Sequence, residues 1–96
     1  MSAKETLFVL VTKPFDLLPK SLAKSTLSMA DKVTLAEEGV YNTPAKLSAA
    51  GVAVDLSKWS VLWEDAEARR VESVFSHSTY SDMAGDIEKY QKTIVL

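Results

Sequence analysis

The sequence contains no cysteine and a single histidine, His77. Without thiols there can be no disulfide, no thiolate metal site and no thiol nucleophile, and nothing argues for an oxidising compartment. One histidine without a cysteine or a second histidine cannot assemble a metal site of the usual kind within one chain. We therefore expect no metal and no cofactor, and we interpret His77 as a loop residue without a catalytic role.

Glycine and proline are also scarce, with three of each in 96 residues. No linker, repeat or low-complexity stretch interrupts the chain, so residues 1–96 are predicted to form a single domain. No Walker motif and no dinucleotide-binding fingerprint is present. Two adjacent arginines, Arg69 and Arg70, do not make a phosphate site without a glycine-rich loop.

The sequence has no long hydrophobic run and no excess of basic charge. Its first apolar stretch covers residues 7–11, which is too short to span a bilayer, and we expect no secretory signal because its flanks lack the pattern of one. The formal net charge of −2 argues against direct nucleic-acid binding. Hydrophobic residues at 47% and charged residues at 25% are ordinary values for a globular protein. We expect a cytoplasmic protein without membrane contact.

Short apolar segments alternate with amphipathic ones along the chain. Strands are predicted at residues 7–11, 31–36, 59–63, 74–75 and 93–96, with residues 52–54 as the alternative to 59–63. Helices are predicted at about 17–29, with Asp16 as N-cap, at 40–50, from Glu64 to about Arg70, and after Thr79. This alternation is typical of βαβ units, and it predicts an α/β fold with a mostly parallel sheet and helices on both faces.

The buried faces of two helices follow from their apolar spacing. In the first helix the predicted stripe is formed by Phe15, Leu18, Leu22, Ala23, Thr26 and Met29. In the last helix it is formed by Tyr80, Met83, Ala84, Ile87 and either Tyr90 or Gln91.

Acidic pairs follow two of the predicted strands. Glu37 and Glu38, with Gly39, come after the second strand, and Glu64 and Asp65 come after the third. Open α/β sheets place their ligand crevice at the carboxyl ends of the strands. Paired carboxylates there can serve in acid–base chemistry or bind a cation. The alternative is that the glutamates are solvated, that Gly39 permits a positive φ, and that the second pair caps a helix.

Large aromatic side chains are numerous for a core of this size. Trp59 and Trp63 are four residues apart, so in one strand they would share a face. Tyr41 and Phe15 add to this surplus. Some of these rings must fill the core, whereas an exposed tryptophan would mark a protein–protein contact.

Three segments, taken in order, resemble the DsrH/TusB family of sulfur-relay proteins. They are DKVTLAEEGVY at residues 31–41, VLWEDAEARR at 61–70 and YSDM at 80–83. The resemblance implies a DsrEFH-like three-layer α/β/α domain with a five-stranded sheet. It also implies assembly with cysteine-bearing DsrE/TusD-like and DsrF/TusC-like partners, which pass persulfide sulfur toward tRNA wobble 2-thiouridine or act in sulfur oxidation. Arg70 stands where the family's A-R-G segment has glycine.

Because the chain has no cysteine, the resemblance implies a non-catalytic scaffold subunit in a homo-oligomer or hetero-oligomer. The interface or crevice candidates are Lys13, Glu37, Glu38, Gly39, Tyr41, Trp59, Trp63, Glu64 and Asp65. A second hypothesis is a stand-alone small-ligand-binding or regulatory module that uses Lys13, Glu38 and Tyr41. A third is an enzyme that uses the clustered acids, and the lack of a complete catalytic constellation makes it the weakest.

Overall fold

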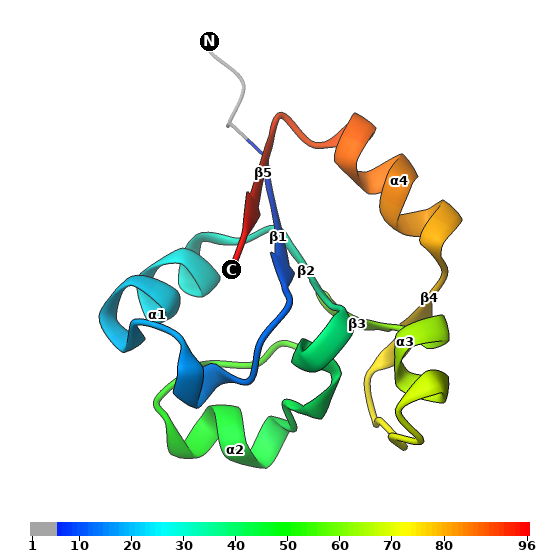
Figure 1. The fold of residues 1–96 in the computed structure, drawn as a ribbon. Coiled ribbons are helices and arrows are strands. Elements are labelled where there is room, and N and C mark those ends of the chain that lie inside the picture. Colours follow the sequence, from blue (N-terminus) through cyan, green and yellow to red (C-terminus); the bar gives the residue numbers. More distant parts are fainter. Residues whose placement is uncertain (1–5) are drawn as a thin grey trace, which may run out of the picture.

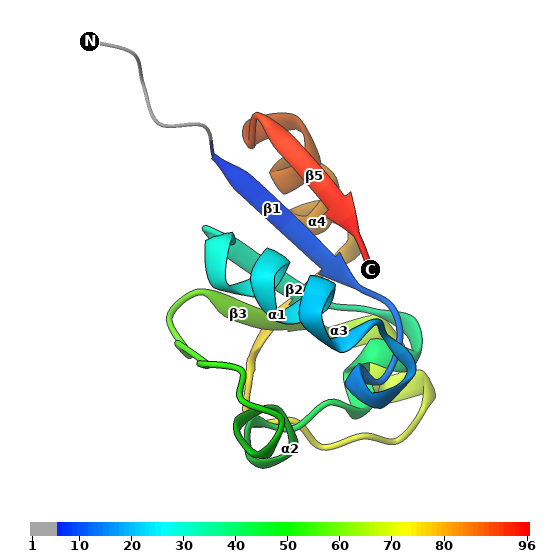
Figure 2. The same cartoon turned by 90° about the vertical axis from the view of Figure 1, so that its left-hand side faces the viewer.

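The computed structural model describes residues 6–96, which form a five-stranded, all-parallel sheet with the strand order β4-β3-β2-β1-β5. This confirms the predicted α/β fold (Figures 1 and 2). The strands are β1 (Leu7–Val11), β2 (Lys32–Leu35), β3 (Trp59–Leu62), β4 (Ser76–Ser78) and β5 (Lys92–Val95).

Helices cover both faces of this sheet. They are η1 (Phe15–Leu17), α1 (Lys20–Met29), η2 (Glu37–Tyr41), α2 (Pro44–Ala49), α3 (Trp63–Ala68) and α4 (Tyr80–Lys89). The first three crossovers all proceed toward β4, whereas the last returns from β4 to β5 at the opposite edge. Because such crossovers are right-handed, α4 lies on the opposite face from α1 and α2 (Figure 1). No helix of the described residues is long and apolar enough to cross a membrane.

The main hydrophobic core lies on one face of the sheet, beneath α1 and α2. Every second residue of the central strands points into it, since side chains alternate along a strand. These residues are Leu7, Val9, Val11, Val33, Leu35, Trp59 and Val61. Phe75 closes the core by stacking on Trp59, with 5.7 Å between the ring centroids.

The opposite face, beneath α4, is much more polar. The predicted apolar face of α4 is wrong for Tyr80, which is 49% exposed, and for Ile87, which is 45% exposed, whereas Met83 and Tyr90 are half-buried. Asp86 is instead the buried residue of this helix. A single ten-residue helix cannot cover the wide face of a five-stranded sheet, so part of that face remains open.

Helix α1 also differs from its prediction. It begins at Lys20 and not near residue 17, so Asp16 is not its N-cap. The residue before a proline avoids the helical region, and Leu18, before Pro19, is extended with ψ 152°. Phe15, Leu18, Ala23 and Thr26 are buried as predicted. Leu22 and Met29, however, are 61% and 66% exposed, and Leu27 is buried in their place.

Two strand boundaries are corrected as well. Trp63 begins α3, so the prediction that it shares a strand face with Trp59 is wrong. The fourth strand is Ser76–Ser78 and not residues 74–75. Val74 is 74% exposed, and the ladder with β3 pairs Ser60 with Ser76. This strand has no apolar pattern by which the sequence could predict it. Its position is set by pairing with β3.

Several turn and cap predictions are confirmed. Thr79 caps α4 in a reciprocal capping box with Asp82. Gly51 ends α2 with a φ of 85°. The exit of α3 was not predicted: Arg70 has a φ of 54° there, a conformation that glycine adopts without steric cost.

Candidate functional site

Asp65 lies at the centre of a polar cluster at the carboxyl ends of the strands. Its side chain is buried, and both carboxylate oxygens accept hydrogen bonds. Oδ2 accepts from the backbone N–H of Glu37 at 2.7 Å, and Oδ1 accepts from the hydroxyl of Tyr80 at 2.5 Å. One carboxylate therefore connects η2, α3 and the first residue of α4.

The backbone of η2 is shaped to reach this carboxylate. Glu37 has a positive φ of 51°, so the prediction that Gly39 supplies the positive φ of this loop is wrong. Gly39 is needed for a different reason. A Cβ at this position would lie 2.0 Å from the carbonyl oxygen of Val11, which is backbone and cannot rotate away. The loop can pack onto the end of β1 only because residue 39 has no side chain.

The other predicted acids are also engaged within the chain. Oε1 of Glu38 accepts from Nε of Arg69 at 3.2 Å, and Nη2 of Arg69 lies 3.2 Å from the same oxygen. Oε2 of Glu64 accepts from the backbone N–H of Tyr80 at 3.2 Å. Oε1 of Glu64 is shielded from solvent and has no hydrogen-bond partner among residues 6–96. The two acidic pairs that sequence places after β2 and β3 thus belong to one connected surface.

This arrangement supports fixed structure better than acid–base chemistry. The hydrogen bond to Asp65 raises the pKa of Tyr80, and burial and the negative charges of Asp65 and Glu64 add to that shift. The phenol therefore stays protonated at neutral pH and cannot serve as a base there. In the described part of the chain, no group of three or more acidic, histidine or cysteine side chains is placed to hold a metal ion.

Removal of the Asp65 charge should therefore shift the titration of Tyr80. We expect Asp65→Asn to lower the Tyr80 pKa, because the amide carries no charge that opposes the phenolate and its one oxygen cannot accept from both the Glu37 N–H and the phenol. The measurement is phenolate absorbance against pH, with the same titration of the Tyr80→Phe variant subtracted to isolate this residue. An unchanged Tyr80 titration in Asp65→Asn would mean that the two side chains do not interact in solution.

The remaining predicted site residues are not brought into this cluster. Lys13 contributes its backbone carbonyl, which accepts from Nδ2 of Asn42 at 3.0 Å. Tyr41 is 41% exposed and lines a separate hollow with Asp16 and Lys46. Trp59 is buried in the core at 4% exposure.

Trp63 is the predicted aromatic residue that reaches the surface beside the cluster. It precedes Glu64 in α3, and its side chain is 41% exposed. Its ring stacks on His77, with 4.4 Å between the ring centroids and 29° between the planes. His77 is an exposed neighbour of this tryptophan, and it lies in β4 and not in a loop as predicted.

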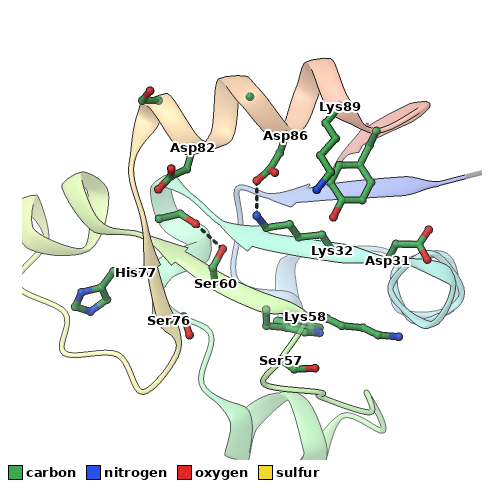
Figure 3. A pocket seen from close by; sticks show the side chains of 15 residues that line it. Asp31, Lys32, Ser57, Lys58, Ser60, Ser76, His77, Asp82, Asp86 and Lys89 are labelled. Atoms are coloured by element: carbon green, nitrogen blue, oxygen red, sulfur yellow. Dashed lines mark hydrogen bonds and ion pairs between the residues drawn. The ribbon is translucent and has the colours of Figure 1, made fainter.

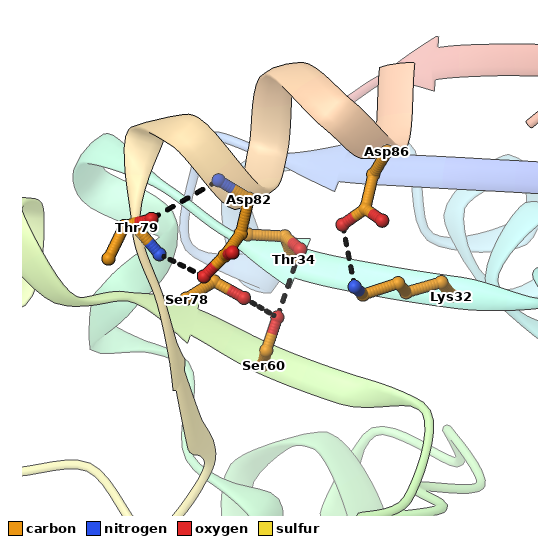
Figure 4. A network of polar contacts seen from close by, with 7 residues as sticks. All are labelled: Lys32, Thr34, Ser60, Ser78, Thr79, Asp82 and Asp86. Carbon is orange, nitrogen blue, oxygen red and sulfur yellow. Dashed lines mark hydrogen bonds and ion pairs between the residues drawn. The ribbon is translucent and has the colours of Figure 1, made fainter. Parts of the chain in front are cut away.

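Sequence analysis did not identify a polar hollow of about 740 Å³ between α4 and strands β2–β4 (Figure 3). Lys32 at the start of β2 forms an ion pair with the buried Asp86 of α4, with 2.6 Å between Nζ and Oδ2 (Figures 3 and 4). The sequence does indicate a polar face here. In β2, Lys32 and Thr34 flank Val33, and such alternation of polar and apolar residues is typical of a sheet with one polar face.

A chain of buried hydroxyl groups crosses the sheet beneath the hollow. The hydroxyls of Thr34 and Ser60 are 3.0 Å apart, and the hydroxyl of Ser78 donates to Ser60 at 2.9 Å (Figure 4). Each of these three residues comes from a different strand. The network satisfies polar groups that would otherwise be costly to bury.

No protein-family model matches this chain, and neither does any curated protein.

Proposed function

We propose that this chain is a non-catalytic scaffold subunit of a DsrH/TusB-type sulfur-relay assembly. The observation that carries the proposal is the convergence of the three sequence segments on which the resemblance is based. Glu37 belongs to the first segment, Asp65 to the second and Tyr80 to the third, and they meet in two hydrogen bonds. Segments separated in sequence that share one buried carboxylate form a single preorganised surface.

The role in this proposal is positional. The chain has no thiol to carry sulfur, so the persulfide would reside on a cysteine of a partner. The acids at the strand ends are held by backbone N–H groups, an arginine and a phenol, and this leaves them little freedom to act on a substrate. The surface they form would shape the surroundings of the partner's cysteine and exclude water and stray thiols.

Co-expression tests the proposal. The chain is expressed alone and together with cysteine-bearing DsrE/DsrF-like proteins from the same source, and the mass of each product is measured by light scattering. A stable mixed complex is expected. A strict monomer that ignores these partners would overturn the proposal, and a homo-oligomer without mixed assembly would leave the sulfur-relay role without support.

Within the mixed complex, Trp63→Ala should weaken association by about tenfold or more, because half-exposed tryptophans at interfaces commonly contribute more than 1 kcal/mol. Leu56→Ala is the matched control. Leu56 is 53% exposed, but it precedes β3 and so lies toward the opposite end of the strands. Equal affinities for the two variants, measured by titration calorimetry, would remove Trp63 from the interface.

The second hypothesis, a stand-alone ligand-binding module, is not supported by the crevice residues that the sequence suggested for it. Glu38 pairs with Arg69, and Tyr41 lines another hollow, so these residues do not form a common crevice. The polar hollow beneath α4 is the feature that favours ligand binding.

A further inference from the structure

The residues that line the hollow beneath α4 are more polar than those on the face of an ordinary parallel sheet. Strands in parallel sheets are usually apolar on both faces. Here the face toward α4 carries Lys32, Thr34, Ser60 and Ser78. Ser60, Ser78 and Asp86 are each more than nine-tenths buried, so the floor of the hollow is a fixed polar surface.

Every carboxylate of the lining is already engaged. Oδ2 of Asp31 accepts from the N–H of Leu7 at 2.8 Å. Oδ2 of Asp82 accepts from the N–H of Thr79 at 3.0 Å. Asp86 pairs with Lys32. Each lining carboxylate therefore has a partner within the chain, and the charges of the three aspartates are balanced by the three lining lysines.

Two of the three lining lysines have no such partner. Neither Lys58 nor Lys89 has a carboxylate within ion-pair distance among residues 6–96, and the Lys89 ammonium lies 5.7 Å from the centre of the Tyr90 ring. Lys32 has three N–H donors, of which the ion pair with Asp86 occupies one. The hydrogen-bond donors that the lining can offer to a ligand are therefore mainly lysine ammonium groups.

These lysines also gather at one end of the hollow. Lys32 begins β2, Lys58 precedes β3 and Lys89 ends α4, which places all three toward the amino ends of the strands (Figure 3). The C-terminal end of α4 is the negative end of its dipole, and Lys89 in the last turn offsets it.

The rest of the lining offers hydroxyl groups and open space. The side-chain hydroxyls of Ser76 and Ser81 make no hydrogen bond within the described chain. A Cβ at Gly85 would meet no atom within 4 Å, so the helix leaves room above the floor. A volume of about 740 Å³ lies within the range of small-molecule sites.

We propose that this hollow binds a phosphorylated polyol, such as a sugar phosphate. The phosphate lies between Lys58 and Lys89, where charge-assisted hydrogen bonds are strongest. The hydroxyls of the polyol bond to Ser76 and Ser81. This site is separate from the strand-end cluster, so its occupation would not require the scaffold role.

The test uses the full chain labelled with ¹⁵N and titrated at low salt with glucose 6-phosphate, inorganic phosphate and glucose. We expect saturable shifts of the amide signals of Ser76, Ser81 and Gly85 with glucose 6-phosphate, weaker shifts with phosphate and none with glucose. The double variant Lys58→Ala/Lys89→Ala should bind glucose 6-phosphate about tenfold or more weakly, because both charged donors are removed.

A second pair of lysines provides the control. Lys20 and Lys24 lie on α1, on the opposite face of the sheet, and Lys20→Ala/Lys24→Ala removes the same charge. Wild-type affinity in this variant supports the site. The proposal is overturned if both double variants lose affinity equally, which indicates non-specific attraction, if glucose binds as well as its phosphate, or if the amide signals of the hollow do not move. None of these outcomes depends on assembly with a partner.

Discussion

Gly39→Ala should destabilise the domain by about 3 kcal/mol, since overpacking against a fixed neighbour commonly costs 1–3 kcal/mol and more where nothing can yield. The added Cβ would lie 2.0 Å from the carbonyl oxygen and 2.8 Å from the carbonyl carbon of Val11. The same oxygen accepts the N–H of Ala36 at 2.9 Å, so outward movement of η2 would also strain the end of the β1–β2 ladder. The measurement is urea unfolding followed by circular dichroism.

An effect of this size is large for this protein. Domains of this length have a total free energy of unfolding of about 5–15 kcal/mol, and a loss of 3 kcal/mol lowers the melting temperature by roughly 12–24 °C. Thermal unfolding should therefore detect the Gly39→Ala change without ambiguity.

Gly85→Ala is the matched control for this experiment. The substitution is the same, but the new methyl group meets no atom within 4 Å, and Gly85 lies inside α4. Alanine in a helix interior is more favourable than glycine by about 0.5–1 kcal/mol, so this variant should be slightly more stable than the wild type. Equal stabilities of Gly39→Ala and Gly85→Ala would contradict the close approach of η2 to β1.

Asp65→Ala should cost about 2–3 kcal/mol, because a buried donor left without an acceptor loses the bond and pays its desolvation. The N–H of Glu37 would lose its acceptor while the residue is held at a φ of 51°. The hydroxyl of Tyr80 is less affected, since this residue is 49% exposed and water can replace Asp65. Hydrogen exchange at the Glu37 amide should accelerate together with the loss of stability.

Two further variants define what is lost in Asp65→Ala. Asp65→Asn keeps an acceptor oxygen and should lose about 1 kcal/mol, which is the usual contribution of a single neutral hydrogen bond. Glu67→Ala removes an exposed acid from the same helix and should stay within about 0.5 kcal/mol of the wild type. If Asp65→Ala were no more damaging than Glu67→Ala, the carboxylate would not link η2, α3 and α4.

The strand-end surface also illustrates how adjacent acids can be misinterpreted from sequence. Paired carboxylates after a strand indicate acid–base chemistry only when they remain free to exchange protons. Here Asp65 and Glu38 are held by Glu37, Tyr80 and Arg69. This supports a surface of fixed shape, which is what the scaffold proposal requires.

The sequence by itself determined the order and type of the main elements. The apolar run at residues 7–11 predicted β1, and the stretch at residues 59–63 predicted β3, which ends one residue earlier, at Leu62. Thr79 predicted the start of α4, and Gly51 the end of α2. These predictions succeeded because capping and β-branched propensity act over a few neighbouring residues. The composition alone also shows that the chain has no cysteine, which excludes thiol chemistry by this chain.

Only the tertiary structure decided which faces are covered and which polar residues meet. The buried residue of α4 is Asp86 and not Ile87, because Lys32 on a strand distant in sequence supplies its partner. The strand Ser76–Ser78 forms by pairing with β3 and has no apolar pattern of its own. Gly39 is required by the carbonyl of Val11, 28 positions earlier in the sequence. Such contacts depend on the sheet order and on chain crossings, which local periodicity does not encode.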